Sequence, residues 1–170
     1  MTNEPYLADK EKLSSLKDMY CEFHRETSGS DEPISNESKR DIDRHLTSIR
    51  GSDNDWVYLV DGSGKTPVGF IACHKYNNAA DKHIKPGDVE IESFVAREGR
   101  GQGLGKILKT TAIDSVAERA DGSARVLSSV ERGNSVNIHI LKKTGFRELR
   151  GTAYSANNGQ EYSVYAKKVA

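Results

Sequence analysis

The sequence predicts an α/β fold, in which a mixed sheet of about six or seven strands is flanked by about four helices. The chain opens with two segments of helical spacing. It continues with three runs rich in β-branched and aromatic residues, and then alternates helical and strand-like segments. Elements in this order bury their apolar faces as a sheet covered by helices. At 170 residues the chain has the size of one ordinary domain, so we expect a single domain over 1–170.

The first half of the chain carries two predicted helices and three long predicted strands. Leu13, Leu16 and Tyr20 share one side of the first helix. Asp9 is placed to cap this helix, and Gly51 is a fitting end for the second. The sequence "GSGK" is a hairpin signal between the first two long strands. We predict a short strand at 4–7, helices over 9–26 and 36–49, and strands over 55–61, 67–76 and 89–96.

The second half alternates helices and strands. Leu104, Leu108, Ala112 and Val116 recur at helical spacing, and Gly145 ends a later, short helix. The turn "ANNG" separates the last two strands. We predict helices over 103–120 and 135–144, and strands over 125–130, 146–155 and 160–169.

Composition and charge exclude several classes of protein. The 25 basic residues balance the 25 acidic ones, whereas a dedicated nucleic-acid-binding protein shows a basic stripe. No run of about 18 apolar residues is present, and the first residues, "MTNEPYLADKEKL", do not resemble a secretory signal. Cys21 and Cys73 lie far apart and outside any metal-binding pattern. We therefore expect a cytoplasmic protein with two free thiols, no metal, no nucleic-acid partner and no membrane contact.

The stretch "EGRGQGLGK", over 98–106, lies between a predicted strand and a predicted helix. It holds Gly99, Gly101, Gly103 and Gly105. Glycine lets the backbone adopt positive φ and approach a ligand closely, so that successive N–H groups form a concave anion site. The start of the following helix adds free N–H groups and a favourable dipole. Since a tight turn alone would need one or two glycines, we interpret this stretch as a phosphate-binding loop.

Two common phosphate-binding motifs do not fit this loop. A Walker A loop requires GxxxxGK followed by Ser or Thr, but Ile107 follows Lys106, and Arg100 stands where the first glycine is needed. In a dinucleotide-binding GxGxxG motif, the third glycine would fall at Leu104 or Lys106. The loop is therefore neither a Walker A motif nor a dinucleotide fingerprint.

The segment from Arg100 to Gly105 instead reads as Arg, two residues, Gly, one residue and Gly. In this it resembles the GCN5-related N-acetyltransferase (GNAT) family. A second block, "NSVNIHILKKTGF" over 134–146, is similar to the family's N-x-x-A-x-x-L-Y-E-K-x-G-F segment. Arg97 replaces the proline often found before the loop. Because the element order also resembles the GNAT fold over nearly the whole chain, the resemblance implies that fold.

The resemblance implies that acetyl-CoA is the donor of an acetyl group. In this family the strands that correspond to 89–96 and 125–130 splay apart, and backbone groups at the end of the first strand bind the pantetheine arm. The glycine loop holds the pyrophosphate, and Lys106 and Lys109 either add positive charge there or are ordinary surface lysines. The implied coenzyme-binding residues are Phe94, Val95, Arg100, Gly101, Gln102, Gly103, Leu104, Gly105, Lys106 and Asn134.

One position departs from the family pattern. The residue seven places after the asparagine is usually a tyrosine that protonates the departing thiolate, and here it is Leu141. Another group or water could protonate the thiolate, because a thiol pKa of about 8.5 makes it a fair leaving group. Alternatively the alignment is shifted, or the protein binds an acyl-CoA without transferring the acyl group.

The attacking amine needs a general base, because a lysine-like amine with a pKa of about 10.4 is protonated at neutral pH. Glu90 and Glu92 share one face of the strand over 89–96, where the family often places a catalytic carboxylate. We expect Glu92, and after it Glu90, to be the base. The alternative is the solvent-facing row of an amphipathic strand. Weaker candidates are His74, Tyr76 and His139, with Tyr154 as a substitute acid and Trp56 as a core residue.

The resemblance implies direct attack by a primary amine on the thioester in a ternary complex. In this family the acceptor site lies among the first two helices, their connection and the final hairpin. The connection carries Asp31 and Glu32, which suit a cationic amine or belong to a solvated polar loop. We expect a small-molecule acceptor; the alternatives are protein amino groups, or a GNAT-like acyl-CoA-binding module without transfer. A homodimer is compatible with the resemblance.

Overall fold

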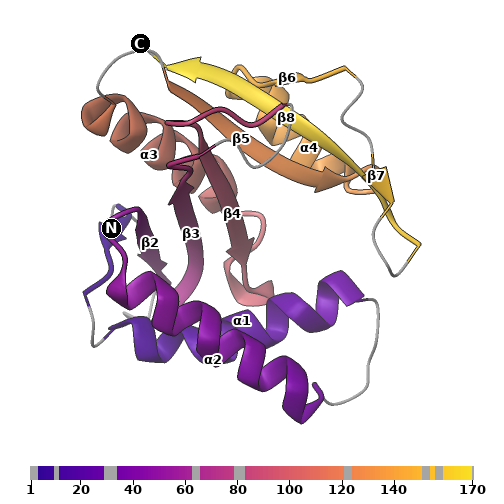
Figure 1. Ribbon diagram of the computed structural model, residues 1–170. Coiled ribbons are helices and arrows are strands. Elements are labelled where there is room, and N and C mark those ends of the chain that lie inside the picture. Colours follow the sequence, from indigo (N-terminus) through magenta and orange to yellow (C-terminus); the bar gives the residue numbers. More distant parts are fainter. Residues whose placement is uncertain are drawn as a thin grey trace.

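The chain forms a mixed β-sheet with helices on both faces (Figure 1). The computed structural model describes residues 4–9, 12–28, 34–62, 66–78, 83–120, 124–150, 154–155 and 159–169. The strands are β1 (Tyr6–Leu7), β2 (Asp55–Asp61), β3 (Pro67–Lys75), β4 (Val89–Val95), β5 (Ala124–Glu131), β6 (Arg147–Glu148), β7 (Tyr154–Ser155) and β8 (Glu161–Val169). The helices are α1 (Lys12–Ser28), α2 (Asn36–Gly51), α3 (Leu104–Arg119) and α4 (Ser135–Lys143), with a 3₁₀ turn η1 (Arg97–Gly99) before α3.

The predicted elements are confirmed up to the end of α4, with ends that shift by a few residues. The Asp9 carboxylate accepts a hydrogen bond of 2.9 Å from the backbone N–H of Lys12 and so caps α1 as predicted. The hairpin between β2 and β3 closes through a bond of 2.9 Å from Gly62 N–H to the carbonyl of Thr66; residues 63–65 lie outside the described part.

The continuous strand predicted over 146–155 is wrong. It divides into β6 and β7, which both pair with β8. Glu148 pairs with Tyr165 and Tyr154 with Tyr162, so five residues lie between the two pairs on one side and two on the other. The pairing register with β8 therefore changes between β6 and β7, and among the described residues the sheet has eight strands.

The strands follow the order β1-β2-β3-β4-β5-β8-β6, with β7 also paired to β8. All neighbours are antiparallel except β4 and β5, which are parallel. These two strands pair only at their first residues, Val89 with Val126 and Glu90 with Leu127. Beyond that point they diverge, β4 toward α1 and α2 and β5 toward β7 (Figure 1). The predicted splay is confirmed, and it leaves the second half of β4 with an open backbone edge.

A buried ion pair lies at the joined end of the two diverging strands. Asp88, which is 3% exposed, directly precedes β4, and Arg125 lies at the start of β5. The Arg125 Nε and Nη2 atoms donate to the two Asp88 carboxylate oxygens at 3.0 and 2.5 Å. Such a bidentate bond is strong and directional, so it holds β4 and β5 together at the point from which they separate.

Two apolar cores cover the two faces of the sheet. Leu16 and Phe70 belong to the core under α1 and α2, and Ile71 and Leu108 to the core under α3. Trp56 is 8% exposed and belongs to the second core, as predicted. Cys21 and Cys73 are buried and free, also as predicted. No helix in the described ranges is both long and apolar enough for a membrane span.

The two faces of β4 have different chemistry. Val89 and Ile91 pack into the core under α3, whereas Phe94 packs under α1 and α2. Since successive side chains of a strand alternate, Glu90 and Glu92 share the face of α1 and α2, and Ser93 shares the face of α3. The expectation of a common face for the two glutamates is confirmed, but their face is covered by helices rather than open to solvent.

Candidate active site

A cleft of about 1350 Å³ follows the open edge of β4. On one side it reaches α1, the start of β2 and the end of β3. On the other it reaches the glycine loop, the start of α3, α4 and the second half of β5. The predicted residues that line it are Glu90, Glu92, Phe94, Val95, Arg100, Gly101, Gly103, Leu104, Gly105, Lys106 and Asn134. The fold therefore gathers the expected coenzyme and catalytic residues in one continuous space.

Gln102 is the predicted site residue that does not line this cleft. Its side-chain amide donates a hydrogen bond of 3.1 Å to the backbone carbonyl of Glu98, so it folds back onto its own loop. Only the backbone of Gln102 remains for a role in the loop.

The four glycines of the loop serve two different purposes. Gly101 and Gly103 have φ of 78° and 77°, and a Cβ added at either would meet nothing within 4 Å. These two positions leave an open concavity in front of the N-terminus of α3, which suits an anion. Gly99 and Gly105 are instead needed for close packing, since added Cβ atoms would lie 3.0 Å from Val68 and 3.3 Å from Ile140.

Arg100 joins the glycine loop to α1. Its Nε donates to the carbonyl oxygen of Val95 at 3.0 Å, and its Nη2 lies 2.5 Å from the Glu26 carboxylate. The residue therefore spans the cleft from the glycine loop to α1. Lys106 is exposed and lines the cleft, which fits the expected positive charge near a phosphate.

Lys109 is neither at the surface nor free to reach the glycine loop. The residue is 1% exposed, and its Nζ donates a hydrogen bond of 2.6 Å to Ser93 Oγ. Burial lowers the pKa of its ammonium group to about 8. Both expectations for this lysine, pyrophosphate charge and ordinary surface residue, are wrong, because α3 turns this position toward β4.

The backbone of β4 offers alternate residues to the open edge. The Ala96 N–H bonds to the Val68 carbonyl, and the Tyr76 N–H bonds to the Asp88 carbonyl, so even-numbered residues direct their backbone groups toward β3. Because hydrogen-bonded and non-bonded pairs alternate in an antiparallel ladder, Ser93 and Val95 present theirs to the open edge. The backbone of Phe94 is directed toward β3, so the expected backbone role does not fit Phe94 and falls to Ser93 beside Val95.

The second family block, over 134–146, forms α4 and its flanks. The side chain of Asn134 caps the helix, accepting a hydrogen bond of 3.0 Å from the backbone N–H of Asn137. Its oxygen is used in this way, so the amide NH₂ is the part that can face a ligand in the cleft. Leu141 is fully buried in the core under α3, and this position holds no proton donor.

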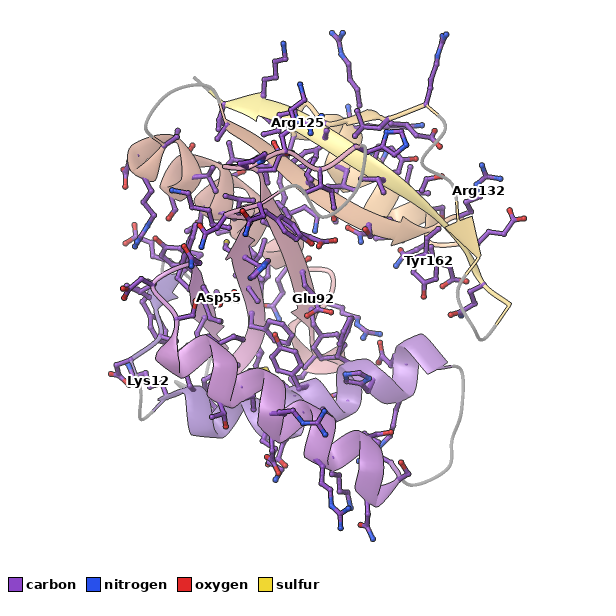
Figure 2. All side chains as sticks on the ribbon, in the orientation of Figure 1. Lys12, Asp55, Glu92, Arg125, Arg132 and Tyr162 are labelled. Carbon is purple, nitrogen blue, oxygen red and sulfur yellow. The ribbon has the colours of Figure 1, made fainter. Side chains whose placement is uncertain are left out.

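Glu92 lies between the sheet and α1 (Figure 2). The hydroxyl of Tyr20 on α1 donates a hydrogen bond to its carboxylate. Burial raises the pKa of Glu92 to about 7, the nearby Glu90 charge adds to this, and the Tyr20 bond opposes it. A carboxyl group with a pKa near neutrality is well matched to accept a proton at physiological pH. The role of Tyr20 had no signal in the sequence beyond its place on the apolar side of a helix.

Glu90 is held on both carboxylate oxygens. Tyr76 Oη donates to one at 2.5 Å and Ser129 Oγ to the other at 3.0 Å. These bonds link β4 to the end of β3 and to β5, near the point where β4 and β5 separate. Glu90 is therefore the more constrained of the two candidate bases. Tyr76 thus acts on Glu90 and does not itself line the cleft.

The weaker candidates divide between the cleft and the outside. His74 lines the cleft, and its Nδ1 lies 2.5 Å from an Asp55 carboxylate oxygen. His139 is exposed and does not line the cleft. Asp31, Glu32 and the side chain of Tyr154 lie outside the described residues. In the part of the chain that is described, no three His, Cys, Asp or Glu side chains gather as a metal site would.

The cleft unites a glycine-rich anion loop at a helix start, an open strand edge, and a carboxyl group with a pKa near neutrality. This arrangement suits a phosphate-bearing coenzyme along the strand and a proton-accepting group beside it. A protein-family model, the Acetyltransferase (GNAT) family, matches residues 14–146. The chain therefore belongs to the GNAT acetyltransferase family, and it is an N-acetyltransferase that takes its acetyl group from acetyl-CoA.

Individual relatives agree with this assignment. An uncharacterized N-acetyltransferase from Archaeoglobus fulgidus is 30% identical over 112 residues, which are 66% of this chain and 72% of that protein. The ribosomal-protein-alanine N-acetyltransferase from Brucella melitensis has a TM-score of 0.73 at 18% identity, covering 96% of this chain and 98% of that one. A phosphinothricin acetyltransferase from Sinorhizobium meliloti in complex with AcCoA has a TM-score of 0.72 at 14% identity, covering 98% and 89%. At these identities the solved structures show the fold alone.

Proposed function

We propose that the enzyme transfers an acetyl group from acetyl-CoA to the primary amine of a small molecule, by direct attack in a ternary complex with Glu92 as the base. The observation that carries this proposal is the place of Glu92. It lies beside the open edge of β4, on the face covered by α1, with a pKa of about 7.

The chemical argument for a base at this place is simple. An ordinary amine binds as an ammonium ion, since its pKa is about 10.4, and it must lose a proton before it can attack a carbonyl carbon. The Glu92 carboxylate accepts that proton directly or through water. The proton leaves the nitrogen as the C–N bond forms, while the C–S bond of the thioester breaks.

The donor end of the cleft fits a CoA molecule. The concavity at Gly101 and Gly103 suits the pyrophosphate, and the α3 N-terminus adds to this attraction. The backbone of Ser93 and Val95 suits the amide groups of the pantetheine arm, as an added strand would. The amide of Asn134 flanks the same space.

The acceptor end of the cleft is acidic. Glu26, Asp55, Glu90 and Glu92 line it; Glu26 is paired with Arg100 and Asp55 with His74, so Glu90 and Glu92 are the carboxyl groups that remain to attract a cation. Carboxylates near the attack point attract a cationic amine and raise its local concentration. Acetylation of a protein amino group is the second candidate, since the structural neighbours include both phosphinothricin and ribosomal-protein-alanine acetyltransferases.

A two-stage experiment tests the proposal. Calorimetry with acetyl-CoA first measures donor binding, and a thiol-release assay then compares small primary amines, peptides with free amino termini, and lysine peptides. We expect turnover with small amines above the rate with water. Turnover with peptides alone would transfer the assignment to protein acetylation. Binding without any thiol release would leave an acyl-CoA-binding module, and no binding would refute the donor site.

A further inference from the structure

Lys109 is a buried lysine, and its surroundings do not offset the free-energy cost of burying its ammonium group. It lies on the inner face of α3 beside Leu108 and Ala112, is 1% exposed, and has its Nζ 2.6 Å from Ser93 Oγ. Burying an ammonium group is costly unless a partner offsets it. Burial alone accounts for its lowered pKa, so no charged group in the described part of the chain compensates. A polar group kept at this cost in a cleft is a candidate for function.

The position of Lys109 relative to Glu92 indicates a function for this buried lysine. Ser93 and Glu92 are neighbours on β4, so their side chains point to opposite faces of the sheet. Both follow Glu90, the last residue of β4 that pairs with β5. A group inserted at this open edge therefore has the Glu92 carboxylate on one side and the Lys109 ammonium on the other.

We propose that Lys109 is the acid that protonates the departing CoA thiolate in this enzyme. The inference rests on the proposed function, because it needs acetyl-CoA along the open edge of β4. The amine nitrogen forms a bond to the carbonyl carbon and the C–S bond breaks, leaving its electron pair on sulfur. The sulfur takes a proton from Lys109 Nζ, while Glu92 takes one from the nitrogen. Lys109 regains a proton from solvent before the next cycle.

This assignment accounts for Leu141. The family tyrosine would donate a proton from α4, but Leu141 is buried in the apolar core. Lys109 lines the same cleft from α3, as Asn137 and Ile140 do from α4. A donor from a neighbouring helix can therefore serve the sulfur from the same face of the sheet.

The other charged groups of the elements around Lys109 lie apart from it. Lys106 is one turn earlier on α3 and is exposed, while Glu90 and Glu92 occupy the opposite face of β4. On α4, His139, Lys142 and Lys143 are exposed. A thiolate placed beside Lys109 would lie next to its ammonium group, so each should stabilise the ionised form of the other.

The first test measures the thiol pKa of bound CoA. Thiolate ultraviolet absorbance is followed against pH with CoA on the wild-type enzyme and on Lys109→Met, a buried apolar side chain of similar length. We expect the pKa to be lower by about one unit or more on the wild-type enzyme, a roughly tenfold change in the thiol equilibrium. Calorimetry on both proteins establishes that CoA is bound. Bound CoA with the same thiol pKa on both would overturn the role of Lys109 while leaving the donor site intact, whereas absent CoA binding to the wild type would overturn the proposed function itself.

The second test uses only the wild-type enzyme, so it does not depend on how a variant folds. The Lys109 side-chain carbon next to nitrogen is followed by NMR in ¹³C-lysine-labelled protein as the pH is changed. We expect the pKa of Lys109 to rise when CoA binds and to stay lower with desulfo-CoA, which lacks the sulfur. Equal pKa values with the two ligands would overturn the proposal.

The third test separates acid catalysis from packing. With an amine found in the thiol-release screen, Lys109→Met should lower kcat by about 10²-fold, with a much smaller change in KM for acetyl-CoA. The wild-type rate should fall as pH rises above about 8, because Lys109 loses its proton there, and the variant should lack this decline. An unchanged decline in the variant would assign it to another group and overturn the proposal.

Discussion

The hydroxyl of Tyr20 donates a hydrogen bond to the carboxylate of Glu92, joining helix α1 to the middle of β4. Tyr20 is 1% exposed, and its ring stacks on Phe70 with 4.4 Å between centroids. The hydroxyl is therefore held in place by the apolar core beneath it. The helix that covers this end of the cleft thus also lowers the pKa of Glu92 through the Tyr20 hydroxyl, against the effect of burial.

Tyr20→Phe should shift the pH dependence of catalysis. The Tyr20 bond lowers the pKa of Glu92, so its loss should raise that pKa above about 7 and move the rising limb of kcat/KM for the amine to higher pH. Phenylalanine keeps the stacking on Phe70. Tyr76→Phe is the matched control, because it removes a hydroxyl from Glu90 instead. A rising limb that stays in place in Tyr20→Phe would contradict Glu92 as the base.

Glu92→Gln should lower turnover far more than donor affinity. The amide cannot accept the amine proton, and general base catalysis is typically worth about 10²–10⁴-fold. We expect a fall of kcat within that range while the Kd for acetyl-CoA, measured by calorimetry, changes little. Glu90→Gln is the comparison, with a smaller expected loss. Wild-type activity in Glu92→Gln would remove this residue from the mechanism.

Glu92→Gln should also change how the free energy of unfolding depends on pH. Glu92 has a folded-state pKa of about 7, above the value of 4.5 of a glutamate in the unfolded chain. Its contribution to stability is therefore present at low pH and is lost as pH rises through this window. Glu92→Gln removes that loss, so its gain over wild type should develop between about pH 4.5 and 7 and reach about 1–3 kcal/mol above pH 7. Urea unfolding at pH 5 and pH 8 measures it, and equal differences at both values would contradict the raised pKa.

Gly103→Glu should abolish donor binding. The change puts a side chain and a negative charge into the concavity that suits the pyrophosphate, where nothing now lies within 4 Å of an added Cβ. Gly87→Glu is a matched control, because Gly87 also has positive φ and open space but does not line the cleft. Both variants should carry a similar backbone strain of about 1 kcal/mol. Retained acetyl-CoA affinity in Gly103→Glu, by calorimetry, would refute this placement of the pyrophosphate.

Arg125→Met should destabilise the protein strongly. It leaves the Asp88 carboxylate, with a side chain 4% exposed, buried without its bidentate partner. Breaking a buried ion pair in this way costs about 3–5 kcal/mol. Arg132→Met is the control, since its pair with Glu161 is exposed and worth about 0–1 kcal/mol. Equal unfolding free energies for the two variants, from urea denaturation, would show that the joined end of β4 and β5 does not depend on this pair.

Local sequence patterns predicted most of the secondary structure, and for a clear reason. The helices carry apolar residues at helical spacing, and β2 to β5 are rich in β-branched or apolar residues. The break between β6 and β7 was not predicted, because it arises from pairing with β8 rather than from a local signal.

The sequence by itself determined the nature of the donor. Glycines at 101 and 103, next to a helix start, define an anion site within a few consecutive residues, where local backbone geometry is decisive. Only the tertiary structure decided the chemistry around the thioester. Tyr20 meets Glu92, and Lys109 meets Ser93, because β4 carries neighbouring residues to opposite faces of the sheet and different helices cover those faces. Burial of the two ionisable groups, which moves both pKa values toward neutrality, is a property of that packing and of no single segment.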